Sequence, residues 1–145
     1  EMVIRDWSSD VCSSDLISYD LFENGVDFMQ EQRHFDCIVT NPPYRESMKF
    51  ISKSKKIAFK KIILLLPLSY LHGQQRYEEI YSDIDFRLKC VYVFTRYPLL
   101  GEPLREDGKY NTGMQVYSWF LWDKEWRDEP VIRHINNNPY VLKKR

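Results

Sequence analysis

Two short runs with apolar centres, each stopped by proline, constrain the fold of this chain most. The first covers residues 35–40 and the second covers residues 62–67. Runs of this kind are typical of strands buried on both faces of a parallel sheet. Between them, residues 46–61 place apolar side chains seven positions apart among lysines, which predicts an amphipathic helix. Strand, helix and strand therefore follow one another in the first half of the chain.

The second half continues this alternation. We predict a helix over residues 74–82, strands over residues 87–96, 115–122 and 131–135, and a turn over residues 123–130. A polar stretch over residues 98–113 holds three of the five glycines and is expected to form a long loop. Long loops in compact domains are usually functional or disordered. The order of the elements predicts an α/β fold with helices on the faces of the sheet.

The composition excludes several classes of protein. A chain of 145 residues fits one domain with a hydrophobic core. Its 43% hydrophobic and 29% charged residues are typical of a globular protein rather than a disordered one. No apolar run reaches the roughly 20 residues that span a bilayer, and no secretory signal is visible, so we expect a cytoplasmic protein. The formal net charge is zero, so any binding of nucleic acid must depend on local patches.

The cysteines give no sign of a disulfide framework or of a metal centre. Cys12, Cys37 and Cys90 are odd in number and widely spaced, and the three histidines form no ligand cluster with them. We therefore expect neither disulfides nor a bound metal.

The first sixteen residues differ in character from the rest. Residues 6–16 show no usable periodicity and contain the tripeptide Ser-Ser-Asp twice. This segment resembles the in-frame translation of a common sequencing adapter, so residues 1–16 are expected to be a non-native leader. The alternative is a genuine polar leader. Segments of foreign origin are excluded from fold reasoning, and the natural sequence is then expected to start near Ile17, inside a domain.

The tetrapeptide Asn41-Pro42-Pro43-Tyr44 directly follows the first predicted strand and carries groups that could take part in a reaction. Asn41 and Pro42 each precede a proline, which pushes both toward extended backbone, and the prolines supply no N–H group. The side-chain carbonyl of Asn41 and the main-chain carbonyl of Pro42 are thereby held as two acceptors. Tyr44 offers an aromatic face on which a base can stack. The alternative is a plain turn whose tyrosine covers a core edge.

Residues 35–44 resemble motif IV of the amino methyltransferases that act on adenine in DNA. The similarity to phage and bacterial enzymes of this type extends over residues 17–135. It implies a Rossmann-like methyltransferase sheet, mostly parallel, with an antiparallel hairpin near the C terminus and the first strand missing. Residues 17–145 would then be a partial catalytic domain that uses S-adenosylmethionine to methylate the N6 amino group of an adenine extruded from duplex DNA.

The resemblance also implies residues that bind the methyl donor. Asp27 matches the acid that accepts a hydrogen bond from the donor's adenine amino group, and Phe28 matches the apolar residue that packs on its ring. Asp20 matches the acid that binds the ribose hydroxyls. The alternative for both acids is an ordinary surface position in a loop. The glycine-rich turn that should precede Asp20 is absent from the sequence.

Candidate contacts to DNA lie in or beside the predicted long loop. They are Arg96, Arg105, Lys109 and Tyr110. The lysines that follow the tetrapeptide are more simply explained as the solvated face of the predicted helix.

Two other functions fit parts of the same pattern. Transfer to a protein glutamine or to RNA uses the same tetrapeptide for other planar amino groups, but the glycine-rich segment expected after it in the glutamine enzymes is missing. A non-catalytic binding module would use the basic helix and aromatic strands to dock a partner.

Overall fold

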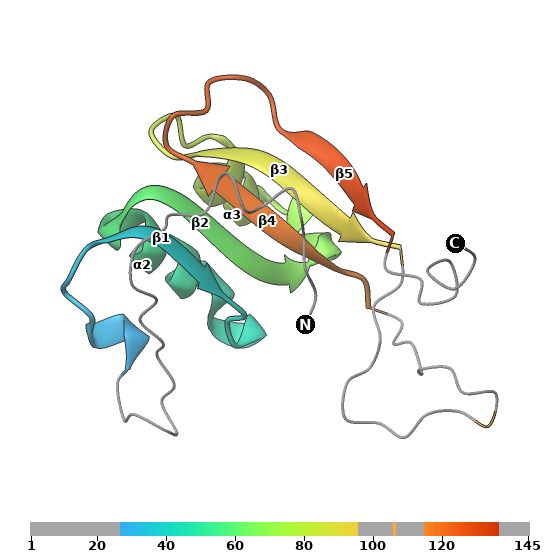
Figure 1. The fold of residues 1–145 in the computed structure, drawn as a ribbon, viewed down its shortest axis with the longest axis horizontal. Helices are drawn as coiled ribbons and strands as arrows, with labels where there is room; N and C mark the ends of the chain where they lie inside the picture. Colours follow the sequence, from blue (N-terminus) through green and yellow to red (C-terminus); the bar gives the residue numbers. More distant parts are fainter. Residues whose placement is uncertain (1–26, 96–105, 107–114, 137–145) are drawn as a thin grey trace, which may run out of the picture.

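The structure is a computed structural model, and it describes residues 27–95, 106 and 115–136. These residues form a five-stranded sheet with the strand order β1-β2-β4-β3-β5 (Figure 1). The strands are β1 (Phe35–Thr40), β2 (Ala58–Pro67), β3 (Arg87–Phe94), β4 (Tyr117–Asp123) and β5 (Val131–Ile135). The helical elements are η2 (Phe28–Gln30), η3 (Tyr44–Glu46), α2 (Ser47–Ile57), η4 (Leu68–Leu71), α3 (Gln74–Arg76) and η5 (Tyr77–Tyr81).

The sheet is mixed, because one strand runs against the others. β1 pairs with β2 and β3 pairs with β5 in parallel, whereas β4 is antiparallel to both of its neighbours, β2 and β3. The expected α/β sheet with parallel pairs is therefore present, but it was predicted to be mostly parallel and two of its four strand pairings are antiparallel. The antiparallel pairing near the C terminus joins β4 to β3, and the last strand, β5, lies on the far side of β3 instead of forming a hairpin with β4.

The helix after the tetrapeptide ends earlier than its sequence predicts. α2 stops at Ile57, and Ala58 already has extended backbone angles. Residues 58–61 belong to β2, where Ala58 is the partner of Phe35 and Lys61 is the partner of Cys37. Pairing with β1 outweighs the helical preference of Ala58 and the two lysines in this segment. The predicted helix over residues 46–61 was thus four residues too long at its C-terminal end.

The helix predicted over residues 74–82 forms, but most of it is a π-helix. Gly73 has a φ of +116°, a value that L-residues with a side chain rarely adopt, and α3 begins directly after it. One turn later the chain widens into η5, where Ser82 donates its N–H to the Tyr77 carbonyl at 3.0 Å. Such i→i+5 turns are rare and often occur near functional sites.

The main core lies between the helices and one face of the sheet (Figure 1). Ile51 and Ile57 of α2 and the buried Ile80 of η5 pack with fully buried residues of the central strands. These strand residues are Ile62, Leu64, Leu66, Phe120 and Trp122. A smaller cluster of Ile63, Cys90 and Leu121 occupies the opposite face. Within the described part of the chain, no helix has the length and apolar character needed to cross a membrane.

Candidate functional site

The tetrapeptide Asn41–Tyr44 lies at the carboxyl end of β1, beside the carboxyl end of β2. The two strands are parallel, with Thr40 opposite Leu64, so the loops that follow them emerge at one edge of the sheet. In open α/β sheets, ligands bind outside the carboxyl ends of the strands. The position of the tetrapeptide is therefore one at which a parallel sheet can hold a ligand.

The backbone of this loop is tied down at its second half. The Pro43 carbonyl accepts the Glu46 N–H at 2.8 Å and lies 3.5 Å from the Ser47 hydroxyl. The Tyr44 carbonyl accepts the Ser47 N–H and also the Tyr70 hydroxyl, at 3.1 Å. Ser47 is fully buried, so these bonds lie away from solvent. The loop leaves β1 and enters α2 in one fixed path.

The first half of the loop keeps its acceptors available. The Asn41 side chain is exposed, and neither it nor the carbonyl of the buried Pro42 has a hydrogen-bond partner among the described residues. Polar groups near a protein interior normally find a partner. Both groups that the sequence singled out as acceptors are thus left without a hydrogen bond from any described residue.

Tyr44 points its ring at the start of β4. Its ring centroid lies 5.1 Å from that of Tyr117, with 29° between the ring planes, which is an offset aromatic stack. Tyr44 is half-buried in this position. Tyr117 therefore packs against the Tyr44 ring at the point where β4 begins.

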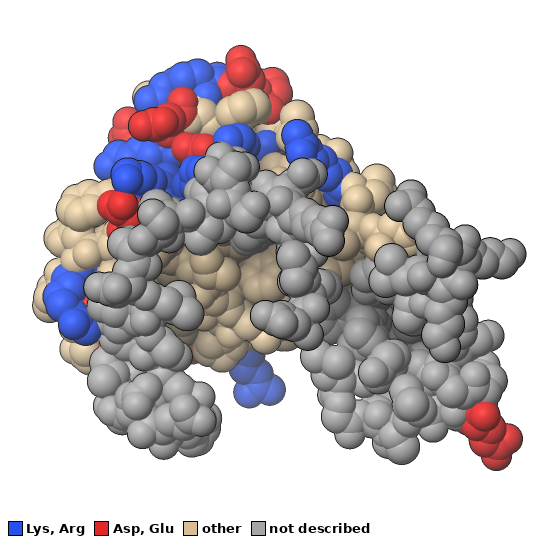
Figure 2. Space-filling view, viewed as in Figure 1, with Lys and Arg blue, Asp and Glu red and all other residues tan. Residues whose placement is uncertain are grey.

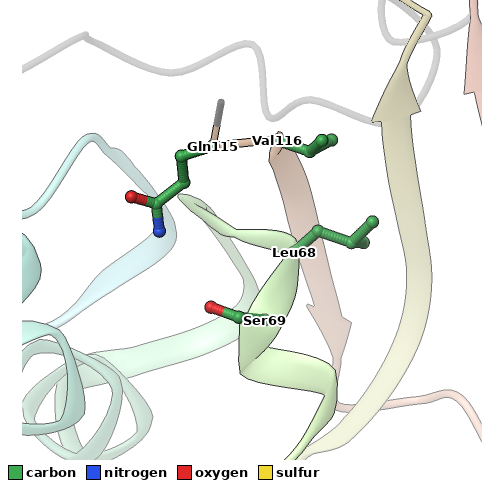
Figure 3. A pocket seen from close by; sticks show the side chains of 4 residues that line it. All are labelled: Leu68, Ser69, Gln115 and Val116. Carbon is green, nitrogen blue, oxygen red and sulfur yellow. The ribbon is translucent and has the colours of Figure 1, made fainter. Parts of the chain in front are cut away.

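An open pocket of about 550 Å³ lies where the start of η4 meets the residues that precede β4 (Figure 3). It is lined by Leu68, Ser69, Gln115 and Val116, and the Leu68 N–H donates to the Val116 carbonyl at 2.8 Å. Figure 3 shows the Gln115 carboxamide and the Ser69 hydroxyl directed to one side and the two apolar side chains directed to the other. The four lining residues that the structure describes carry no charge, which suits a neutral planar group better than a phosphate.

Asp27 and Phe28 are held against the start of α2. The Phe28 ring stacks on Phe50 with centroids 5.0 Å apart and planes 14° apart. Phe50 lies in the first turn of α2, about 5 Å along the helix from its start, and that start follows the tetrapeptide. Asp27 caps η2 by accepting the Met29 N–H at its Oδ1 atom, at 2.9 Å. Its second carboxylate oxygen has no partner among the described residues.

Lys49 and Lys56 of α2 are exposed, as the sequence pattern predicts, but Lys53 and Lys55 are only partly exposed. Lys53 donates to the Glu31 carbonyl, and Lys55 donates to the Glu79 carbonyl and to Asp83, both at 2.6 Å. Partial burial alone would raise the pKa of Asp83, but the bonds from Lys55 and from backbone N–H groups hold that pKa below its usual value. Lys53 and Lys55 therefore join α2 to its neighbours rather than forming a free cationic face.

Lysine and arginine of the described ranges gather with aspartate and glutamate along the upper edge of the face seen in Figure 2. Among the described residues, no group of three or more His, Cys, Asp or Glu side chains could hold a metal ion.

Several expectations concern residues that the structure does not describe. The non-native leader, the donor-binding Asp20, and the DNA contacts Arg96, Arg105, Lys109 and Tyr110 all lie outside the described ranges. The sequence also missed two residues that the structure brings to the loop, Tyr70 and Tyr117. The signal for Tyr70 was Pro67, because residues that follow the second parallel strand must emerge beside those that follow the first.

Comparison with known proteins gives a likeness in fold. No protein-family model and no curated protein matches the sequence. A chain from a study of complex assembly and conformational transition in the type I R-M system is similar over 83% of this chain, with a TM-score of 0.51 and 15% identity. M1.HpyAVI in complex with SAM is similar over 79%, with a TM-score of 0.38 and 16% identity.

The chain spans only part of both structures, 27% of the length of the first and 64% of the second. At such low identity, the first likeness shows a shared fold and nothing about activity. The TM-score of the second is too low to add to it.

Proposed function

We propose that residues 17–145 are part of a catalytic domain that transfers a methyl group from S-adenosylmethionine to the N6 amino group of adenine in DNA. The observation that carries this proposal is a pair of acceptors at the carboxyl end of β1, the Asn41 carboxamide and the Pro42 carbonyl, which no described residue engages. Residues 1–16 are proposed to be a non-native leader. The type I R-M system to which a chain of similar fold belongs favours DNA as the substrate.

The two acceptors address the main chemical difficulty of the reaction. The amino nitrogen of adenine is a poor nucleophile because its lone pair is delocalised into the ring. If Asn41 and Pro42 each accept one N–H bond of that nitrogen, they favour a pyramidal nitrogen whose lone pair points out of the ring plane. S-adenosylmethionine supplies the methyl group on a positively charged sulfur. Fixed dipoles that act only as charge develops stabilise the transition state over the ground state.

Tyr44 supports the same function from beside the acceptors. An adenine inside a duplex is out of reach and must be extruded before its amino group can react. The Tyr44 ring, which stacks with Tyr117, supplies an aromatic surface directly after the two acceptors. Stacking on an aromatic side chain stabilises an unpaired base by about 1 to 3 kcal/mol.

The described residues fit the proposed methyl donor. Asp27 keeps one carboxylate oxygen for an amino group, and Phe28 presents a half-buried ring beside it. The stack of Phe28 on Phe50 holds both near the start of α2, on the side of the sheet where the tetrapeptide emerges. These residues would hold the adenine of the donor, while Asn41 and Pro42 would hold the adenine of the substrate.

The decisive experiment compares the molecules that could receive the methyl group. The protein, with its natural upstream sequence joined to residue 17, is incubated with labelled S-adenosylmethionine and with duplex DNA, RNA or a glutamine-containing protein. The proposal expects label in DNA at N6 of adenine. Label in RNA or in the protein would select the other methyltransferases, and binding of DNA without transfer would select a non-catalytic module.

A further inference from the structure

Tyr70 reaches the candidate site from the neighbouring strand. We propose that Tyr70, locked in place by Arg76, is a positioning residue that fixes the main chain of the Asn41–Tyr44 loop for methyl transfer. This inference depends on the proposed function for the reaction, but its geometric content can be tested without activity.

The contact joins two loops that are distant in sequence. Tyr70 lies in η4, directly after β2, with only 6% of its surface exposed. Its hydroxyl donates to the Tyr44 carbonyl at 3.1 Å, across 26 positions of sequence. The same carbonyl accepts the Ser47 N–H inside η3, and a carbonyl has two lone pairs for two such donors. The bond from Tyr70 ties Tyr44 to the segment that follows β2.

Arg76 fixes the Tyr70 ring from its other side. The guanidinium carbon lies 4.2 Å from the centroid of that ring, within the range of a cation–π contact. One guanidinium nitrogen also donates to the carbonyls of Ser69 at 2.8 Å and His72 at 3.1 Å, on either side of the end of η4. Gly73, with its positive φ, turns the chain so that Arg76 returns over η4. Tyr70 therefore cannot rotate without displacing Arg76.

The position of Tyr44 matters because the rest of the loop is stiff. Thr40 is fixed at one end by its pairing in β1, and two prolines restrict the three residues Asn41 to Pro43. Holding Tyr44 at the other end leaves the two acceptors little freedom to move. A displacement of about 1 Å in a reacting geometry is enough to cost a hundredfold in rate. A single hydrogen bond at Tyr44 thus acts on Asn41 without touching the substrate.

The test uses two tyrosine-to-phenylalanine variants of the protein that includes its upstream sequence. Tyr70→Phe removes the hydroxyl but keeps the ring under Arg76. Tyr81→Phe is the control, because the Tyr81 hydroxyl is buried and has no partner among the described residues, and burial raises its pKa to about 12. We expect Tyr70→Phe to lower kcat about three- to tenfold, which is the effect expected from the loss of a single hydrogen bond. The KM for S-adenosylmethionine should not change. Tyr81→Phe should leave kcat unchanged.

A second measurement does not need activity. Hydrogen exchange of the Glu46 and Ser47 amides, which close the loop onto Pro43 and Tyr44, should become at least threefold faster in Tyr70→Phe than in Tyr81→Phe. Arg76→Lys should give an intermediate effect, because one ammonium group cannot cover the ring and reach both carbonyls. If the unaltered protein methylates no DNA, the proposed function fails and the exchange rates alone decide the positioning role. Unchanged exchange together with unchanged kcat in Tyr70→Phe overturns the inference.

Discussion

Replacing Asn41 with alanine separates a catalytic role from a structural one. The Asn41 carboxamide is exposed and bonds to no described residue, so Asn41→Ala removes no contact that the fold uses. Surface changes of this kind alter the free energy of unfolding by no more than about 0.5 kcal/mol. Removal of a dipole that acts on the transition state costs much more, about 3 to 4 kcal/mol for a comparable group, which is a fall of about 10² to 10³ in kcat. We therefore expect a nearly inactive enzyme of unchanged stability.

The assay for Asn41→Ala has three readouts. Methyl transfer to DNA under saturating donor gives kcat, calorimetric titration gives the dissociation constant of S-adenosylmethionine, and urea denaturation gives the free energy of unfolding. The matched control is Gln74→Ala, which removes another exposed carboxamide that no hydrogen bond engages within the described ranges. Near-normal turnover in Asn41→Ala would refute the reasoning. A loss of stability above about 1 kcal/mol would show that the carboxamide has a structural partner instead.

Three further predictions follow from other contacts. Tyr44→Ala should weaken binding of the extruded base by about 1 to 3 kcal/mol, measured with a fluorescent adenine analogue at the target position. Tyr44→Phe should have a small effect, and an equal loss of binding in both variants would assign the effect to the hydroxyl. Ile51→Ala should lower the free energy of unfolding by about 2 to 5 kcal/mol, because Ile51 is 1% exposed in the main core, and a loss under about 1 kcal/mol in urea titrations would contradict that packing. The depressed pKa of Asp83 should stabilise the fold above the ordinary pKa near 3.8, and this contribution should disappear as the pH falls through the lower folded value. Lys55→Met should weaken that acid dependence, and identical pH profiles of stability would argue against the pair.

The local elements could be predicted because their signals are local. Proline stops and apolar runs located β1 and β2, and alternation located β3 and β4. The boundary between α2 and β2 failed, because lysines tolerate both structures and only the pairing of Ala58 with Phe35 decides between them. Sequence patterns alone also could not give the order of the strands, since it depends on contacts between distant segments.

Local sequence signals likewise decide which residues of the candidate site could be predicted. The acceptors Asn41 and Pro42 were found because the prolines and the preceding strand are adjacent in sequence. Tyr117 and Tyr70 were missed because their place beside Tyr44 depends on where β4 and η4 lie in three dimensions. Residues that support a site from another strand carry little signal of their own.

The reversed direction of β4 has a consequence for engineering. Because β4 runs against β3, the connection over residues 95–116 leaves the sheet at the edge where the tetrapeptide emerges and re-enters it at that same edge. Because both ends of the connection lie at one edge, a replacement needs only to join the end of β3 to the start of β4, and doubling the length of a flexible loop costs only about 0.6 kcal/mol. We therefore expect that a different connection can be grafted at this edge while the strand pairs, and the proposed acceptors Asn41 and Pro42 beside them, keep their places.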